Sequence, residues 1–269
     1  MTSRVLFRAE RLSSEAGQVR PVLGFDTGAP LASLGLFVRG RIVASQARPA
    51  VSHGSALPAA VSELLDEAGL SLADVGGIAV GLGPGSFTGL RVGLSYAKGI
   101  AMAAGCAIMG VSTLDSIALG ALEGVHAAPR PGTLVCPVMD ARKGEVYAAL
   151  YRIVADGLQK LSDDLVMPLA RLGSLLTASV LLAGDSKADE AANQLKGKGI
   201  EVTISDRATL DTRGRLIAMM GAARLARRDT DRAETLEPLY VRPPDTGLPA
   251  AASQEGVWSA ERKNSFGSI

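Results

Sequence analysis

Residues 81–91, GLGPGSFTGLR, constrain the fold of this chain more than any other segment. The apolar stretch before them, GIAVGL (77–82), predicts a buried strand that ends in a glycine-proline turn. Ser86 and Thr88 then provide hydroxyl groups that can cap the start of a helix over 87–104. The segment therefore predicts a strand, a tight turn and a helix in succession, which is typical of an α/β protein.

Small residues recur along one face of this predicted helix, at every fourth position: Gly89, Gly93, Ala97, Ala101 and Gly105. Residues four apart lie on the same face, so they form a smooth ridge that another backbone can approach closely. A glycine inside a helix costs about 1 kcal/mol relative to alanine, and we expect close packing to offset that cost. The ridge contacts either a partner protein or the chain's own sheet, and the pattern leaves both open.

The sequence around this unit predicts a first lobe over residues 21–126. Three strand-like stretches in quick succession predict an antiparallel meander: VLGFDTG (22–28), LASLGLFV (31–38) and RIVASQA (41–47). Apolar residues at helical spacing predict a helix over 55–68, and a strand at 107–111 leads into a short helix capped by Ser112. The order βββαβαβα predicts a mixed sheet covered by helices.

A second lobe is predicted over residues 127–245, after the Pro/Gly-rich segment AAPRPG (127–132). Like the first lobe, it opens with a strand that ends in aspartate, Asp140 in place of Asp26, and continues into a hairpin. We expect its other main elements at 179–185, 187–199 and 214–228. Two such lobes with a cleft between them describe an α/β protein of the two-lobed actin-like ATPase (ASKHA, RNase H-like) fold, with mixed sheets.

Composition limits the class of protein. The 269 residues are 47% hydrophobic, which allows a substantial core, and the net charge of +1 argues against broad electrostatic binding to nucleic acid. Cys106 and Cys136 lie in apolar surroundings, as do reduced core cysteines of cytosolic proteins. The longest apolar stretch, 99–111, is too short to span a membrane. We expect residues 1–20 to form a disordered leader and 246–269 a disordered tail.

The turn Asp26-Thr27-Gly28 lies where the first strand enters its hairpin. In the actin-like architecture this turn holds nucleotide phosphates through backbone N–H groups, and the aspartate positions magnesium. The same tripeptide also forms an ordinary tight turn, so a structural role is the alternative. The glycine-proline turn at 83–85 likewise either binds an anion at the start of the helix or only caps that helix.

Arg142 follows Asp140 at a predicted strand end, where the cleft between the lobes is expected. An arginine there can meet a phosphate or a partner carboxylate. A surface salt bridge with Glu145 is the alternative.

The sequence predicts no catalytic centre and no metal site. A hydrolytic triad needs a base, and the two histidines, His53 and His126, lie in predicted loops. Ser86 lacks the flanking glycines of a nucleophile elbow, and Lys98 lies too far along the helix for a Walker loop.

Over about residues 22–245 the chain resembles the TsaB family, also called YeaZ. The resemblance lies in the FDTG turn, Ser52-His53, GPGSFTGLRVGLSYAKGIA with GVSTLDSIA, MDARKGEVYAALY and PLYVRPPD. The family has the actin-like fold and takes part in making threonylcarbamoyladenosine, the modified adenosine next to the anticodon of certain tRNAs. The resemblance implies a non-catalytic scaffold and activator of this modification.

A comparison with the catalytic relative, TsaD, supports that implication. TsaD carries a metal-binding histidine pair in a run of roughly Asn-His-Leu-Glu-Gly-His. The corresponding run here, 112–117, places Thr113 and Ile117 at the two histidine positions. Neither side chain replaces an imidazole as a metal ligand.

The resemblance also implies the partners. The partners are TsaD, in a heterodimer, and the ATPase TsaE, and the complex is cytoplasmic. The chain contacts tRNA only as part of this complex. ATP or ADP binds at the junction with TsaD, near Arg142. No intrinsic cofactor and no membrane are implied. The family's shared interface uses the first two helices, which also pair with a second copy when no partner is present. The interface residues expected here are Leu57, Val61, Leu64, Gly89, Gly93, Ala97 and Ala101.

Two consequences separate the alternatives. If the ridge contacts a partner, Gly93→Leu or Ala97→Glu weakens pairing and leaves the monomer folded; if it packs on the chain's own sheet, both lower thermal stability. Two other function classes also stay open, an independent hydrolase and an actin-like sugar or acyl kinase. The first requires a triad or metal pair, and the second requires more than Asp26 for phosphoryl transfer.

Overall fold

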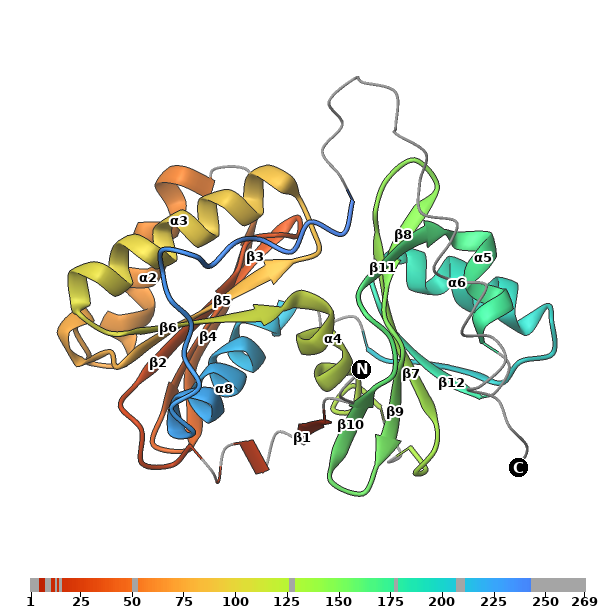
Figure 1. Cartoon of the computed structure of the whole chain (residues 1–269), viewed down its shortest axis with the longest axis horizontal. Helices are drawn as coiled ribbons and strands as arrows, with labels where there is room; N and C mark the ends of the chain where they lie inside the picture. Colours follow the sequence, from red (N-terminus) through yellow and green to blue (C-terminus); the bar gives the residue numbers. More distant parts are fainter. Residues whose placement is uncertain are drawn as a thin grey trace.

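The computed structural model describes residues 5–7, 11–12, 14, 16–49, 53–125, 129–176, 179–206 and 211–242. Two lobes lie side by side, each built on one β-sheet, with helix α4 between them (Figure 1). In this described part of the chain, no helix has the length and apolar character needed to cross a membrane.

The first lobe contains a five-stranded sheet in the order β4-β3-β2-β5-β6. Its strands are β2 (Val22–Asp26), β3 (Leu31–Val38), β4 (Arg41–Pro49), β5 (Gly77–Gly83) and β6 (Ala107–Ser112). Strands β2, β3 and β4 form an antiparallel meander, whereas β5 and β6 run parallel to β2. The predicted meander and mixed sheet are therefore confirmed.

Helices cover both faces of this sheet (Figure 1). Helices α2 (His53–Glu67) and α3 (Phe87–Ala104) pack on one face, and α8 (Arg213–Ala226) packs on the other. A short 3-10 helix, η2 (Leu72–Asp74), precedes β5. The predicted caps at Ser86 and Ser112 are confirmed, because their hydroxyl oxygens accept backbone N–H groups at the starts of α3 and of α4 (Thr113–Ala121). Thr88, the other predicted capping residue, lies inside α3.

The second lobe contains a mixed sheet in the order β1-β10-β9-β7-β12-β13, with β8 also paired to β7 and β11 paired to β8. Its strands are β1 (Val5–Phe7), β7 (Leu134–Asp140), β8 (Glu145–Ala148), β9 (Tyr151–Val154), β10 (Gly157–Lys160), β11 (Leu165–Pro168), β12 (Val180–Gly184) and β13 (Val202–Ile204). Helices α5 (Leu169–Leu175) and α6 (Ser186–Lys196) pack on one face. The predicted hairpin after Asp140 contains two strands in place of one partner strand, because β8 and β9 both pair with β7.

Helix α8 belongs to the first lobe, although it follows the second lobe in the sequence. Three glycines allow its close contact: a Cβ on Gly24 or Gly35 would collide with the backbone of α8, and one on Gly214 would collide with the backbone of β3. The predicted second-lobe range, 127–245, is therefore wrong from Arg213 onward. Helix α8 buries apolar residues such as Leu216 and Met219, but an apolar sequence does not say which sheet buries it.

The chain continues along the first lobe after α8. Residues 229–242, here called the C-terminal strap, follow the edge of the sheet and then reach the second lobe (blue in Figure 1). The N–H of Asp231 donates to the carbonyl of Ile108 on β6, and the N–H of Leu239 donates to the carbonyl of Leu82 on β5. The strap therefore extends the first lobe by backbone hydrogen bonds.

The start of the chain also differs from expectation. Strand β1 pairs antiparallel with β10, and Leu12 and Ala16 are buried in the core. The prediction of a disordered leader over residues 1–20 is therefore wrong for the described part, because backbone pairing and apolar burial fix it. The predicted tail, 246–269, and His126 lie outside the described residues.

One core cluster crosses from lobe to lobe. It joins Leu114 and Ile117 of α4 and several residues of α8 to Val135 and Leu181 of the second sheet. Helix α4 is buried along its whole length. The two lobes therefore meet through a shared apolar core around α4.

Candidate functional site

The carboxylate of Asp26, at the end of β2, is fully buried and bonded to the chain's own groups. The hydroxyl of Thr113 donates to its Oδ2 at 2.6 Å, and the N–H of Gly28 donates to its Oδ1 at 2.7 Å. The guanidinium of Arg213, from α8, lies 3.9 Å from Oδ2. Asp26 therefore ties together the β2 turn, α4 and α8.

The rest of this turn is covered by the start of α3. The hydroxyl of Thr27 donates to the carbonyl of Gly89 at 2.7 Å, and the carbonyl of Gly28 accepts the N–H of Ser86 at 2.7 Å. Asp26 and Thr27 are 0% and 1% exposed. The predicted nucleotide contact at these two residues is therefore wrong for the folded chain, because its own groups fill the turn. The alternative, a structural turn, is confirmed.

The seven residues predicted as a partner interface lie inside the first lobe. A Cβ on Gly93 would collide with the hydroxyl of Thr27, and one on Gly89 would collide with the carbonyl of Thr27. The other five residues are at most 4% exposed, because they pack against the sheet: Leu57, Val61, Leu64, Ala97 and Ala101. The prediction that these residues contact a partner is therefore wrong. The alternative, that the ridge packs within the chain, is confirmed.

The opposite face of α3 is open. Ser95 is exposed, Met102 is 82% exposed, and a Cβ on Gly99 would meet nothing within 4 Å. Beside α3, helix α2 exposes Ala59 and Ser62 on its outward side. These five exposed residues of α2 and α3 are here called the outer helical face.

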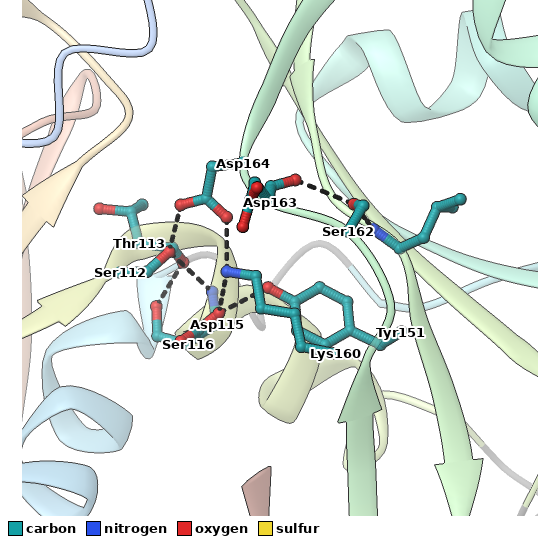
Figure 2. Close-up of polar contacts among 10 residues, drawn as sticks. Ser112, Thr113, Asp115, Ser116, Tyr151, Lys160, Ser162, Asp163 and Asp164 are labelled. Carbon is teal, nitrogen blue, oxygen red and sulfur yellow. Dashed lines mark hydrogen bonds and ion pairs between the residues drawn. The ribbon is translucent and has the colours of Figure 1, made fainter. Parts of the chain in front are cut away.

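A polar cluster joins the two lobes at the start of α4 (Figure 2). The Oδ1 of Asp115 accepts hydrogen bonds from the hydroxyl of Tyr151 at 2.6 Å and from the ammonium of Lys160 at 2.7 Å. Lys160 also donates to Asp164 at 2.6 Å, and Asp164 accepts the hydroxyl of Ser112 at 2.7 Å. The cluster therefore binds α4 to β9, to β10 and to the loop after β10.

The charges of this cluster are fixed near neutral pH. Burial lowers the pKa of Lys160, but the two carboxylates of Asp115 and Asp164 outweigh it and hold this pKa above its ordinary value. Burial and the charge of Asp115 raise the pKa of Tyr151 well above its ordinary value. Both residues therefore favour their protonated forms, a charged Lys160 and a neutral Tyr151, which donate hydrogen bonds to Asp115 where the lobes meet.

Sequence reasoning missed this cluster. Asp115 follows the cap residue Ser112 by three positions, which is typical of an ordinary helix start. Lys160 lies 45 residues further on, and no periodic pattern links the two. Only the packing of α4 against the second lobe brings them together.

The two residues at the positions of the TsaD histidine pair, Thr113 and Ile117, are buried and contact other parts of the chain. The hydroxyl of Thr113 is bonded to Asp26, and Ile117 is fully buried in the shared core. Among the described residues, no group of three or more His, Cys, Asp or Glu side chains could hold a metal ion.

Arg142 lies at the tip of the turn between β7 and β8. Arg142 and Lys143 both have positive φ, 62° and 54°, an uncommon conformation outside glycine. The N–H of Arg142 donates to Asp140 at 2.8 Å, and its side chain is exposed. Glu145, the expected alternative partner, forms its ion pair with Arg242. A contact of Arg142 with a phosphate or a partner stays a prediction.

The sequence is similar to known proteins of threonylcarbamoyladenosine biosynthesis. A protein family described as TsaD: tRNA N6-adenosine threonylcarbamoyltransferase matches residues 40–220. The tRNA threonylcarbamoyladenosine biosynthesis protein TsaB of Escherichia coli is 36% identical over 137 residues, which are 51% of this chain and 57% of that protein. TsaB of Haemophilus influenzae is 35% identical over 126 residues, 47% of this chain and 51% of that protein. The matches thus span little more than half the length of these relatives.

Solved structures extend the likeness over both lobes. The structure of YeaZ from Pseudomonas aeruginosa has a TM-score of 0.68 and 28% identity, and it covers 82% of this chain and 100% of that one. The fold is the two-lobed, actin-like ATPase fold that the sequence predicted.

Proposed function

This chain belongs to the TsaD family, and within it to the TsaB (YeaZ) proteins, and we propose on that basis that it is a non-catalytic subunit of the machinery that makes threonylcarbamoyladenosine in tRNA. It binds and supports the catalytic TsaD subunit in the cytoplasm. TsaE joins this assembly, and the chain contacts tRNA only as part of the complex.

The observation that carries this proposal is the state of Thr113 and Ile117. Thr113 donates a hydrogen bond to the buried carboxylate of Asp26, and Ile117 is buried in the core between the lobes. In these positions Thr113 and Ile117 can neither ligate a metal nor contact a substrate. The fold would have to open before either side chain became accessible. This supports a role in binding over a role in chemistry.

We place the TsaD contact on the outer helical face. An exposed glycine inside a helix costs about 1 kcal/mol relative to alanine, and no described group lies within 4 Å of a Cβ added at Gly99. Small side chains let the helices of two proteins pack closely, and an exposed methionine adapts to varied surfaces. The same face can pair with a second copy when TsaD is absent, because a two-fold dimer uses one surface twice.

Reconstitution tests the role. Purified TsaD and TsaE, supplied with the threonylcarbamoyl donor and tRNA, are assayed with and without this chain, and the modified nucleoside is measured by mass spectrometry. We expect modification only with the chain present, and none by the chain alone. Equal modification without it, or turnover by the chain alone, contradicts the proposal.

The interface has its own test. We expect Gly99→Arg to weaken TsaD binding, measured by calorimetry, about 30-fold, or about 2 kcal/mol, because the large side chain blocks close packing. The matched control is Gln194→Arg, an exposed position on α6 in the other lobe. Both variants should melt like the unmodified chain. Unchanged binding by Gly99→Arg moves the interface elsewhere.

We also propose that ATP or ADP binds at the TsaD junction near Arg142 and not to this chain alone. Asp26 and Thr27 do not fit a nucleotide, because both are buried and bonded, whereas Arg142 is exposed. Calorimetry with ADP should show binding to the complex, about tenfold weaker for Arg142→Ala, and no binding to the isolated chain. Equal affinity in the variant removes Arg142 from the site.

A further inference from the structure

The C-terminal strap touches both lobes, and its first part is fixed to the first lobe by charge. The carboxylate of Asp231 accepts the N–H of Gly110 at 2.7 Å and pairs with Arg224 of α8 at 3.0 Å. Arg224 also donates to the carbonyl of Gly110 at 2.8 Å. These bonds join the strap, α8 and β6 at one point.

The middle of the strap is fixed to the start of α3. The rings of Tyr240 and Phe87 lie 5.2 Å apart, and the Nε–H of Arg91 donates to the hydroxyl of Tyr240 at 2.9 Å. The Arg91 guanidinium also lies 3.9 Å from the centre of the Phe87 ring, which is a cation–π contact. Arg91 thus contacts both aromatic residues and holds this part of the strap against α3.

The end of the strap crosses to the second lobe. The guanidinium of Arg242 donates to the carbonyl of Ala141 at 2.8 Å and pairs with the carboxylate of Glu145. Ala141 lies in the turn between β7 and β8, and Glu145 is the first residue of β8. In Figure 1 the strap passes from the first lobe toward this turn, at a distance from α4.

We propose that the C-terminal strap is a clasp that sets the angle between the two lobes. The core around α4 and the polar cluster beside it form one region of contact, about which the lobes can pivot. A second contact at a separate point removes that freedom. Arg242 provides the second contact, with Tyr240 and Arg91 anchoring the strap on the first-lobe side.

The clasp can open without unfolding either lobe. The side chains of Arg242 and Glu145 are 21% and 33% exposed, and an ion pair open to water is weak. The apolar core around α4 is independent of this pair. The inference concerns the isolated chain and does not rest on the proposed function.

Distance measurements by electron spin resonance test the clasp. Spin labels are placed at the exposed positions Arg41→Cys in the first lobe and Gln194→Cys in the second. Cys106, partly buried, is replaced by serine. Cys136 needs no replacement, because burial raises the pKa of its thiol to about 12 and keeps it unreactive.

We expect one narrow distance in the unmodified chain. Arg242→Glu and Glu145→Arg should each broaden it and add a longer distance, and the double exchange should restore the narrow distance. Arg242→Gln is the milder variant and should broaden it less. The control is Arg232→Glu in the same strap, because that arginine is 82% exposed and pairs only with a 74% exposed glutamate in the described structure.

The outcomes are distinct. Broadening by the single variants with recovery in the exchange supports the clasp. A distribution that stays narrow in both Arg242→Glu and Arg242→Gln overturns it. Broadening that the exchange does not reverse, or that Arg232→Glu reproduces, also overturns it, because the effect then belongs to general destabilisation of the strap.

Discussion

Helix α3 has two smooth faces, and they differ in what lies against them. On the inner face, Gly89 and Gly93 are pressed against Thr27, and a side chain on either would collide with it. On the outer face, no described residue lies within 4 Å of a Cβ added at Gly99. A helix glycine costs stability on both faces, but only on the inner face does the chain itself supply the group that requires it. Gly93 is therefore required by packing within the chain, whereas no contact within the described chain explains the glycine at position 99.

The largest effect is expected on the inner face. Gly93→Leu forces a side chain into the hydroxyl of Thr27, so we expect a loss of about 3 kcal/mol or more in the free energy of unfolding. Urea denaturation followed by circular dichroism measures the loss. Gly99→Leu on the outer face is the matched control and should stay within about 1 kcal/mol. Equal losses in the two variants would erase the difference between the faces.

A smaller effect is expected at the outer glycine. Gly99→Ala adds a methyl group in open space and improves helix propensity, so we expect about 1 kcal/mol more stability. The melting temperature should rise by about 2–4 °C for a chain of this size. Binding to TsaD should persist, because alanine is still small. A loss of stability would show that the outer face is packed in solution.

An effect of similar size concerns the hydrogen bond of Thr27. Thr27→Val keeps the shape of the side chain and removes its bond to the carbonyl of Gly89, so we expect a loss of about 1 kcal/mol. The change tests whether the inner face is held by fit alone or also by this bond. Thr88→Val is the control, since Thr88 is exposed on the same helix. Unchanged stability in both variants would leave steric fit as the only requirement for Gly93.

The sequence predicted the elements of the first lobe well. Alternation and apolar runs located its strands, and the hydroxyls of Ser86 and Ser112 located the starts of α3 and α4. These features depend on neighbours within a few residues, which a sequence displays directly. They also led to the correct fold, because the order of elements in this lobe allows few arrangements.

The sequence did not predict which group covers each face of α3. The four-residue spacing of Gly89 and Gly93 shows that they share one face of the helix. It does not show which part of the protein, or which partner, packs against that face. Ser95 and Gly99 show the same spacing on the outer face. Burial follows from the position of the helix on the sheet, which only the structure supplies.

Contacts between distant segments were also missed. Helix α8 was assigned to the second lobe by its place in the chain, although Gly24 and Gly35 in the first sheet leave room for its backbone. Those strand glycines were the available signal, because glycine inside a strand often marks a close approach. Strand β1 has three residues, too few for any periodic pattern.

The return of α8 to the first lobe has a consequence for how this protein is made. Gly214, at the start of α8, bonds to Ser33 across 181 residues of chain. A ribosome adding about 5–20 residues per second releases the first sheet many seconds before the helix that closes it. During that interval one apolar face of the sheet is bare and open to chaperones or to aggregation, and the first lobe is not complete until helix α8 has emerged.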